Sequence, residues 1–191
     1  SILRTIRDNI VSVLKTLSYQ NTVENIHRKD TTTGLYSAEY LYGKGKTVID
    51  GYDESSICMF TINNIEEINE QYGRTVGTEM IKEVAEVVKD NISDEYIFVR
   101  YMGPKFAIVF TGVDGESVSG FVKSIKEYIE EIKVKTGKTK NKKSKEEIMA
   151  VPLTNFVIAT YYKGTGIEEL TKKLEDYLNE SEKTDSKIVC I

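Results

Sequence analysis

Two short apolar runs separated by four turn-forming residues constrain the fold of this chain more than any other feature. The runs cover residues 96–101 and 106–110, and Met102-Gly103-Pro104-Lys105 lies between them. Aromatic and β-branched residues, which favour strands, dominate both runs. A Gly-Pro pair between two such runs is typical of a tight turn. The sequence therefore predicts an antiparallel β-hairpin at this point.

Predicted strands and helices alternate on both sides of this hairpin. Apolar runs predict further strands over residues 56–62, 153–162 and 188–191. Helical spacing of apolar residues predicts helices over residues 37–42, 63–72, 76–91, 117–134 and 164–178. Residues 43–55 are polar and rich in Gly and Asp, which predicts a turn. The main order, β-α-α-β-β-α-β-α-β, predicts an α+β fold of ferredoxin-like topology, with a central sheet flanked by helices.

The first thirty residues carry a different pattern. Apolar residues recur at steps of three and four, at Leu3, Ile6, Ile10, Val13 and Leu17. Two heptads are too short for a stable free coiled coil, so this helix either pairs with its copy in a dimer or packs on its own domain. We expect residues 1–29 to form a stalk helix cut from a longer protein, and residues 30–191 to form the domain. His27, the only histidine, is expected to be solvated or hydrogen-bonded.

The charge of the chain is unevenly distributed. Residues 133–145 contain seven lysines and no acid, so the rest of the chain carries −11 within a net charge of −4. This balance argues against a general nucleic-acid binder, and the run lacks aromatic residues that stack on bases. We expect a solvated, mobile loop here, and an acidic partner, anionic lipid and RNA remain alternatives.

The composition also bears on where the protein acts. No apolar run approaches the roughly 18 residues of a membrane-spanning helix, and no signal peptide is recognisable. Cys58 and Cys190 lie far apart and fit no C-x-x-C site, which favours free thiols in a reducing cytoplasm. We therefore expect a cytoplasmic domain without a membrane segment, including the cytoplasmic part of a larger, membrane-attached protein.

Three stretches resemble, in order and at matching spacing, the motifs of one family. Asp30-x-Thr32-Thr33-Gly34-Leu35 resembles D-x-L-T-G-L, and residues 68–74 (INEQYGR) are similar to I-N-D-x-Y-G-H. Residues 100–106 (RYMGPKF) resemble R-Y-G-G-D/E-E-F. These are motifs of the GGDEF domains, the bacterial diguanylate cyclases. The resemblance covers about residues 26–191 and implies a nucleotidyl-cyclase palm fold.

Family members condense two GTP molecules into cyclic di-GMP with divalent metal ions, and the resemblance implies where their metal ligands would lie. The family supplies an aspartate at the end of the first strand, the next backbone carbonyl and an acid at the third signature position. Here those positions hold Thr61, Ile62 and Pro104, while Asn63 replaces a second aspartate. Mg²⁺ prefers anionic oxygen ligands. We therefore expect metal catalysis in the manner of the family to fail.

The other signature positions agree with this expectation. Lys105 reverses the charge of the fourth signature residue, which is acidic in the family. Met102 replaces the first glycine and is expected to fill space left open for a phosphate, whereas Gly103 matches the second glycine. Pro104 also removes a backbone N–H from the hairpin tip.

The resemblance also implies candidate nucleotide contacts. Asn69 and Thr78 stand where the family contacts guanine, and with Ile62 they are the nucleotide-binding candidates. Two basic residues that hold the outer phosphates align with Glu182 and Ser186, and a shift of one residue would replace them by Lys183 and Lys187.

The inhibitory product site of the family, R-x-x-D, falls at residues 93–96 (SDEY). Neither the arginine nor the aspartate is in place. We therefore expect no cyclic di-GMP binding by that route.

Three functions follow from this pattern. The first is a catalytically inactive GGDEF-like signalling module that acts through dimerisation or protein contacts, without a catalytic residue, metal or cofactor. The second is a non-catalytic GTP receptor. The third is a residual diguanylate cyclase or phosphohydrolase that uses Mg²⁺ with GTP and other ligands, such as Asp30 or Glu70. The expected partners are a second copy bound through the stalk helix or another protein, with GTP under the alternatives and no specific nucleic acid.

Overall fold

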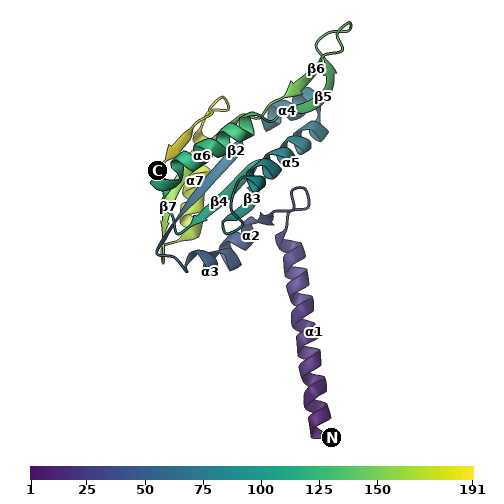
Figure 1. The fold of residues 1–191 in the computed structure, drawn as a ribbon, viewed down its shortest axis with the longest axis vertical. Helices are drawn as coiled ribbons and strands as arrows, with labels where there is room; N and C mark the ends of the chain where they lie inside the picture. The colour runs from purple at the N-terminus through teal and green to yellow at the C-terminus, as the bar shows by residue number, and fades with distance from the viewer.

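A computed structural model describes the backbone of residues 1–191 and the side chains of residues 1–15 and 29–191. It begins with a long helix, α1 (Ile2–Arg28), which extends away from the rest of the domain (Figure 1). The hydroxyl of Ser1 accepts a hydrogen bond from the Arg4 N–H at 3.3 Å and so caps this helix. The side chains of Leu17 and His27, on which sequence expectations rest, lie outside the described set.

The domain is built on one mixed sheet in the strand order β1-β3-β4-β2-β7-β8. Its strands are β1 (Tyr36–Ser37), β2 (Glu54–Ile62), β3 (Ile97–Met102), β4 (Lys105–Thr111), β7 (Thr154–Tyr162) and β8 (Ile188–Cys190). The four inner strands are antiparallel, while β1 and β8 add parallel edges. The inner order β3-β4-β2-β7 is that of a ferredoxin-like sheet, and β3 and β4 form the predicted hairpin. The predicted fold class is confirmed.

Helices cover both faces of this sheet (Figure 1). They are α2 (Ala38–Tyr40), the π-helical turn η1 (Leu41–Gly45), α3 (Lys46–Ile49), α4 (Ile65–Tyr72), α5 (Arg74–Asp90), α6 (Gly115–Glu130) and α7 (Ile167–Glu180). Helices α5 and α6 bury one face, where the Phe60 ring stacks between Phe106 and Phe156 at centroid distances of 5.2 and 4.7 Å. Helix α7 and the α2–α3 segment bury the other face. Burial on both faces explains the nearly continuous apolar strands.

Three sequence expectations are wrong in detail. Residues 43–55 are not simply a turn, because they contain part of η1 and all of α3, which buries Ile49. The helix predicted to reach residue 134 ends at Glu130. The lysine run is not a loop but enters a second sheet, the hairpin of β5 (Val134–Thr139) and β6 (Glu147–Ala150). The side chains of Val134 and Thr136 are buried between exposed lysines, and this period of two is the signature of a strand.

Among the helices of the described part of the chain, none combines the length and the apolar character that crossing a membrane requires.

Candidate functional site

Three polar residues form one row across the sheet at the end of β2. Thr61 of β2 pairs with Lys105 of β4 on one side and with Asn155 of β7 on the other. Residues directly opposite one another on neighbouring strands point to the same face, and this row shares the face that α7 covers. Thr61 is only 6% exposed and Asn155 is fully buried. The row therefore defines the chemistry at the position where the resemblance of the sequence places the first metal ligand of the family.

Lys105 is tied to α7 by two contacts. Its ammonium lies 3.3 Å from the Glu175 carboxylate and donates a hydrogen bond to the Asn179 side-chain oxygen at 2.6 Å. Glu175 and Asn179 are one helical turn apart, so both reach the same cation. The sequence analysis missed both partners. The sequence holds no local signal for them beyond the positive charge of Lys105, because they lie 70 and 74 residues away along the chain.

The sequence analysis also missed Asn155, whose side-chain amide adds another hydrogen-bond donor to the row. Its side-chain oxygen accepts a hydrogen bond from the Lys187 N–H at 3.3 Å. Its buried side-chain nitrogen has no hydrogen-bond partner among the described residues. A buried amide N–H without a partner is costly and favours an acceptor beside it, not a cation.

The tip of the β3–β4 hairpin closes on the end of β2. The Ile62 N–H donates a hydrogen bond to the Pro104 carbonyl at 3.1 Å. Gly103 has a φ of 55°, in the left-handed region that glycine adopts without strain. Met102 is 62% exposed and borders a cavity of about 500 Å³ that Asp30 and Arg100 also line. This cavity lies on the Asp30 side of the hairpin, so the expectation that Met102 fills the space for a phosphate stays a prediction.

The polar residues that follow β2 hold the C-terminal loop in place. The Asn63 amide nitrogen donates hydrogen bonds to the carbonyls of Asp185 at 2.8 Å and Glu182 at 3.4 Å. Lys183 forms an ion pair with Glu66 at 2.6 Å, and Lys187 lies 3.5 Å from Asp185. Ser186, the other position aligned with a phosphate-binding residue, accepts a hydrogen bond from Lys126 at 2.8 Å. Both lysines that a one-residue shift would bring to the phosphates are already paired with carboxylates.

The guanine-contact candidates lie at the junction of α4 and α5. Asn69 is partly buried in α4, and Thr78 is exposed on α5. A Cβ atom added to Gly77 would come within 1.7 Å of the Asn69 side-chain oxygen, so this carboxamide packs directly on the glycine backbone. Asn69 thus has a structural contact of its own, while Ile62 is buried in the core.

Asp30 connects the residues that follow α1 to the signature hairpin. Its carboxylate accepts hydrogen bonds from the Thr33 N–H at 2.8 Å, the Thr33 hydroxyl at 2.7 Å and the Arg100 guanidinium at 3.0 Å. Arg100 also donates to the Gly103 carbonyl at 2.9 Å. Partial burial acts to raise the pKa of Asp30, but the hydrogen bonds from Thr33 and Arg100 outweigh it and hold the pKa below its usual value.

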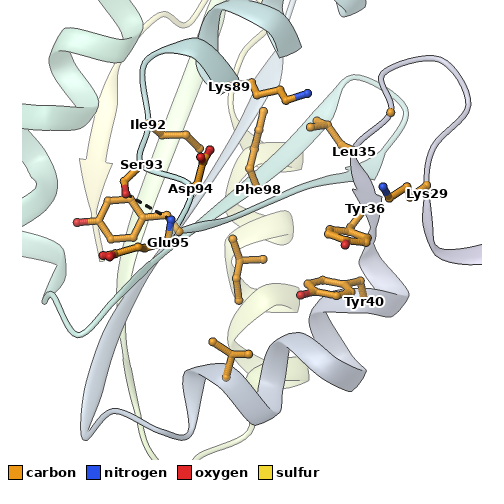
Figure 2. A pocket seen from close by; sticks show the side chains of 14 residues that line it. Lys29, Leu35, Tyr36, Tyr40, Lys89, Ile92, Ser93, Asp94, Glu95 and Phe98 are labelled. Atoms are coloured by element: carbon orange, nitrogen blue, oxygen red, sulfur yellow. Dashed lines mark hydrogen bonds between the residues drawn. The ribbon is translucent and has the colours of Figure 1, made fainter. Parts of the chain in front are cut away.

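A cavity of about 520 Å³ lies beside residues 93–96, the stretch that the sequence alignment places at the product site of the family (Figure 2). One wall carries the stacked rings of Tyr36 and Tyr40, and the Lys29 ammonium lies 5.3 Å from the centroid of the Tyr36 ring. On the other wall, the Ser93 hydroxyl accepts a hydrogen bond from the Glu95 N–H at 3.3 Å. The local loop uses Ser93 to hold its own backbone, and Asp94 is exposed at the rim.

The residues at the row do not fit a magnesium ion. Mg²⁺ requires oxygen ligands, preferably anionic, in near-octahedral geometry. The row presents a hydroxyl, an ammonium and an amide N–H₂ group, and the Pro104 side chain has no ligand atom. Across the side chains of residues 1–15 and 29–191, no group of three or more His, Cys, Asp or Glu is arranged to hold a metal ion.

Comparisons with known proteins agree with the fold and the motifs. The family model described as "Diguanylate cyclase, GGDEF domain" matches residues 27–187. The diguanylate cyclase VdcA of Vibrio cholerae is 23% identical over 152 residues, which cover 80% of this chain and 43% of the relative. The uncharacterized protein YtrP of Bacillus subtilis is 30% identical over 91 residues, 48% of this chain and 16% of the relative. The chain thus spans less than half the length of these curated relatives.

Solved structures share the architecture. The coiled coil and GGDEF domain of DgcB from Caulobacter crescentus, in complex with c-di-GMP, matches with a TM-score of 0.72 at 15% identity, and the match covers 100% of both chains. The diguanylate cyclase SiaD of Pseudomonas aeruginosa, in complex with its activator SiaC, matches with a TM-score of 0.71 at 12% identity, covering 99% of this chain and 70% of SiaD. The family match spans most of the chain, and the chain belongs to the GGDEF domain family of diguanylate cyclases.

Proposed function

We propose that this chain is a catalytically inactive GGDEF module of cyclic di-GMP signalling, acting through dimerisation or protein contacts. The observation that carries this proposal is the Lys105–Thr61–Asn155 row. It offers hydrogen-bond donors and a positive charge at the place where the family binds a dication. Pro104, at the third signature position, cannot supply the missing carboxylate.

The reaction of the family depends on the carboxylates that the row lacks. Attack of a ribose hydroxyl on the α-phosphate of GTP relies on metal ions to activate the nucleophile and absorb charge. The Lys105 ammonium is already engaged with Glu175 and Asn179. Those contacts direct it toward α7, which supports a structural role for this residue. The first turn of α4 also carries Glu66, which is paired with Lys183, and Glu67, whose charge disfavours a triphosphate at that helix terminus.

The stalk supplies a route to dimerisation. Leu3, Ile6, Ile10 and Val13 are between 50% and 80% exposed along α1, although an apolar seam favours burial. Similarity to DgcB, solved with its coiled coil, and to SiaD, solved with its activator, supports a module that passes signals through stalk or protein contacts. A second copy paired along α1 is the proposed partner. Cys58 and Cys190 are free, which supports a reducing, cytoplasmic setting.

The central test is incubation of the chain with GTP and Mg²⁺, followed by mass spectrometry for cyclic di-GMP and by thermal-shift measurements. We expect no product and no shift with GTP. Product formation would overturn the proposal. Stabilisation without product would instead support a GTP receptor, because a ligand at 100 times its dissociation constant adds about 2.7 kcal/mol.

A restored variant sharpens this test. Thr61→Asp and Pro104→Glu return the two acids, and the exchange Lys105→Glu with Glu175→Lys returns the signature charge without leaving two carboxylates side by side. We expect this variant to gain a Mg²⁺-dependent thermal shift. The matched control, Thr61→Asn with Pro104→Gln and the same exchange, has similar side-chain sizes but lacks the acids at positions 61 and 104, and it should gain no shift.

The stalk is tested separately by sedimentation. Ile6→Glu with Ile10→Glu places charges on the seam and is expected to convert a dimer into a monomer. The control, Thr5→Glu with Val11→Glu, places the same charges off the seam and should leave the dimer intact. A wild-type chain that is monomeric at high concentration would contradict dimerisation through α1.

A further inference from the structure

The lysine-rich segment is an ordered hairpin that extends from the domain beyond the end of α4 (Figure 1). At its base, Val134 pairs with Ala150, and both residues are buried. At its tip, the Asn141 side-chain oxygen accepts hydrogen bonds from the backbone N–H groups of Lys143 at 3.1 Å and Ser144 at 2.6 Å. These bonds fix the turn, so the hairpin presents its side chains from a defined backbone.

Most of the lysines on this hairpin are unpaired. Lys138 donates to the Gln71 carbonyl and lies 5.5 Å from the centroid of the Tyr72 ring, which docks the hairpin on α4. Lys140 pairs with Glu146 at 2.5 Å. The other five are exposed and form no ion pair with any side chain in the described part of the chain: Lys133, Lys135, Lys142, Lys143 and Lys145. Lys142, Lys143 and Lys145 lie at or beside the tip of the hairpin, and Lys133 and Lys135 lie at its base. These five free cations attract a counter-charge from another molecule.

The type of cation indicates the kind of partner. All seven basic residues of the run are lysines, and none is arginine. Arginine is preferred where a planar group is read in a bidentate manner, whereas lysine acts as a hydrated point charge suited to diffuse attraction. The segment 133–147 has no aromatic side chain to stack on exposed bases. These features favour a broad anionic surface over sequence-specific nucleic acid or a shaped protein pocket.

The rest of the chain explains why the lysines are set on a projection. Residues 133–147 hold seven lysines and two acids, Glu146 and Glu147, so the remainder of the sequence carries −9, which repels an anionic surface. Charge interactions are screened over about 10 Å at 0.1 M salt, so a hairpin that reaches beyond the body makes its contact with reduced repulsion. Clusters of four to eight lysines are a known basis for attraction to anionic lipids.

We propose that the β5–β6 hairpin, residues 133–147, is a docking element for an anionic phospholipid surface. The contact is electrostatic, and it requires no bound nucleotide and no catalysis. Its test is therefore independent of the proposal that the chain is an inactive cyclase module.

The test is co-sedimentation of the 191-residue chain with vesicles of phosphatidylcholine alone or with phosphatidylglycerol at about a third of the lipid. We expect binding only to the anionic vesicles, and a marked loss between about 0.05 and 0.3 M salt. Lys142→Gln, Lys143→Gln and Lys145→Gln together should weaken partitioning at least tenfold, since each lysine near a lipid surface contributes about fivefold. These side chains make no ion pair, so the melting temperature should stay unchanged.

The matched control removes the same charge elsewhere, through Lys82→Gln, Lys172→Gln and Lys173→Gln on exposed positions of α5 and α7. It should change partitioning by less than about threefold. Equal binding to neutral vesicles, or equal loss in both triple variants, would overturn the proposal. Failure to bind anionic vesicles would also overturn it, and so would hairpin-dependent binding to a labelled RNA without binding to vesicles.

Discussion

Arg100 and Lys105 stand at opposite ends of the same hairpin turn, and each is tied to a carboxylate far away in the sequence. Arg100 pairs with Asp30 at 3.0 Å, and both residues match the family motifs. Lys105 pairs with Glu175 at 3.3 Å, and its charge is opposite to the one the motif calls for. The first pair fixes the turn to the segment that follows α1, and the second fixes it to α7. The turn is thus held at both ends by contacts that support the fold, but only the Arg100 end follows the family pattern.

The largest effect should come from the Arg100 end. Asp30→Ala removes the acceptor of three donor groups and leaves the Arg100 side chain, which is only 17% exposed, without its counter-charge. We expect a loss of about 2 kcal/mol in the free energy of unfolding, measured by urea denaturation. Asp94→Ala, at an exposed carboxylate, should change it by less than about 0.5 kcal/mol. Equal effects of the two variants would mean that Asp30 does not hold the turn.

At the Lys105 end, the free energy of unfolding should depend on having opposite charges at positions 105 and 175, and not on which of the two residues carries which charge. Lys105→Glu places a second carboxylate beside Glu175 and should cost about 1.5 kcal/mol of unfolding free energy. The exchange Lys105→Glu with Glu175→Lys should recover most of that loss. If the exchange is no better than the single variant, the pair is not what holds this end of the hairpin, and the structural account of Lys105 fails.

Asn69 extends the comparison to another residue that matches the family. Gly77→Ala should conflict with the Asn69 carboxamide, which lies where the new methyl group would go. The substitution should be worse by about 1 kcal/mol with Asn69 present than in an Asn69→Ala background, as a double-mutant cycle measures. Additive effects would show that Asn69 does not support the α4–α5 junction. The match of Asn69 to the family motif would then need an explanation other than packing at this junction.

Periodicity in the sequence was enough to predict the inner strands of the main sheet, the edge strand β8 and the main helices, but not the two-residue strand β1 or the β5–β6 sheet. It failed where isolated apolar residues lie in polar surroundings: Leu41 and Ile49 are fully buried, although they flank or lie within a segment rich in Gly and Asp. The motifs located Thr61, Pro104 and Lys105, but not the partners that give the row its character. Asn155 meets Thr61 only through strand register, and Glu175 meets Lys105 across 70 residues. Such contacts depend on the tertiary fold and leave no local trace in the sequence.

The smallest expected effect is a dependence of stability on pH, which arises from Asp30 at the Arg100 end of the turn. Partial burial opposes ionisation of Asp30, but hydrogen bonds from Thr33 and Arg100 prevail and lower its pKa below the ordinary value of 3.8. A carboxylate whose pKa is lower in the folded state stabilises the fold above the unfolded value, and this contribution is lost as the pH falls through the folded value. Wild-type stability should therefore decline more steeply than that of Asp30→Asn below about pH 4. Urea midpoints of the wild type and of Asp30→Asn, measured from pH 6 downward, test this. If the two midpoints fall in parallel with pH, the acid sensitivity arises elsewhere and the Asp30–Arg100 pair has no role in it.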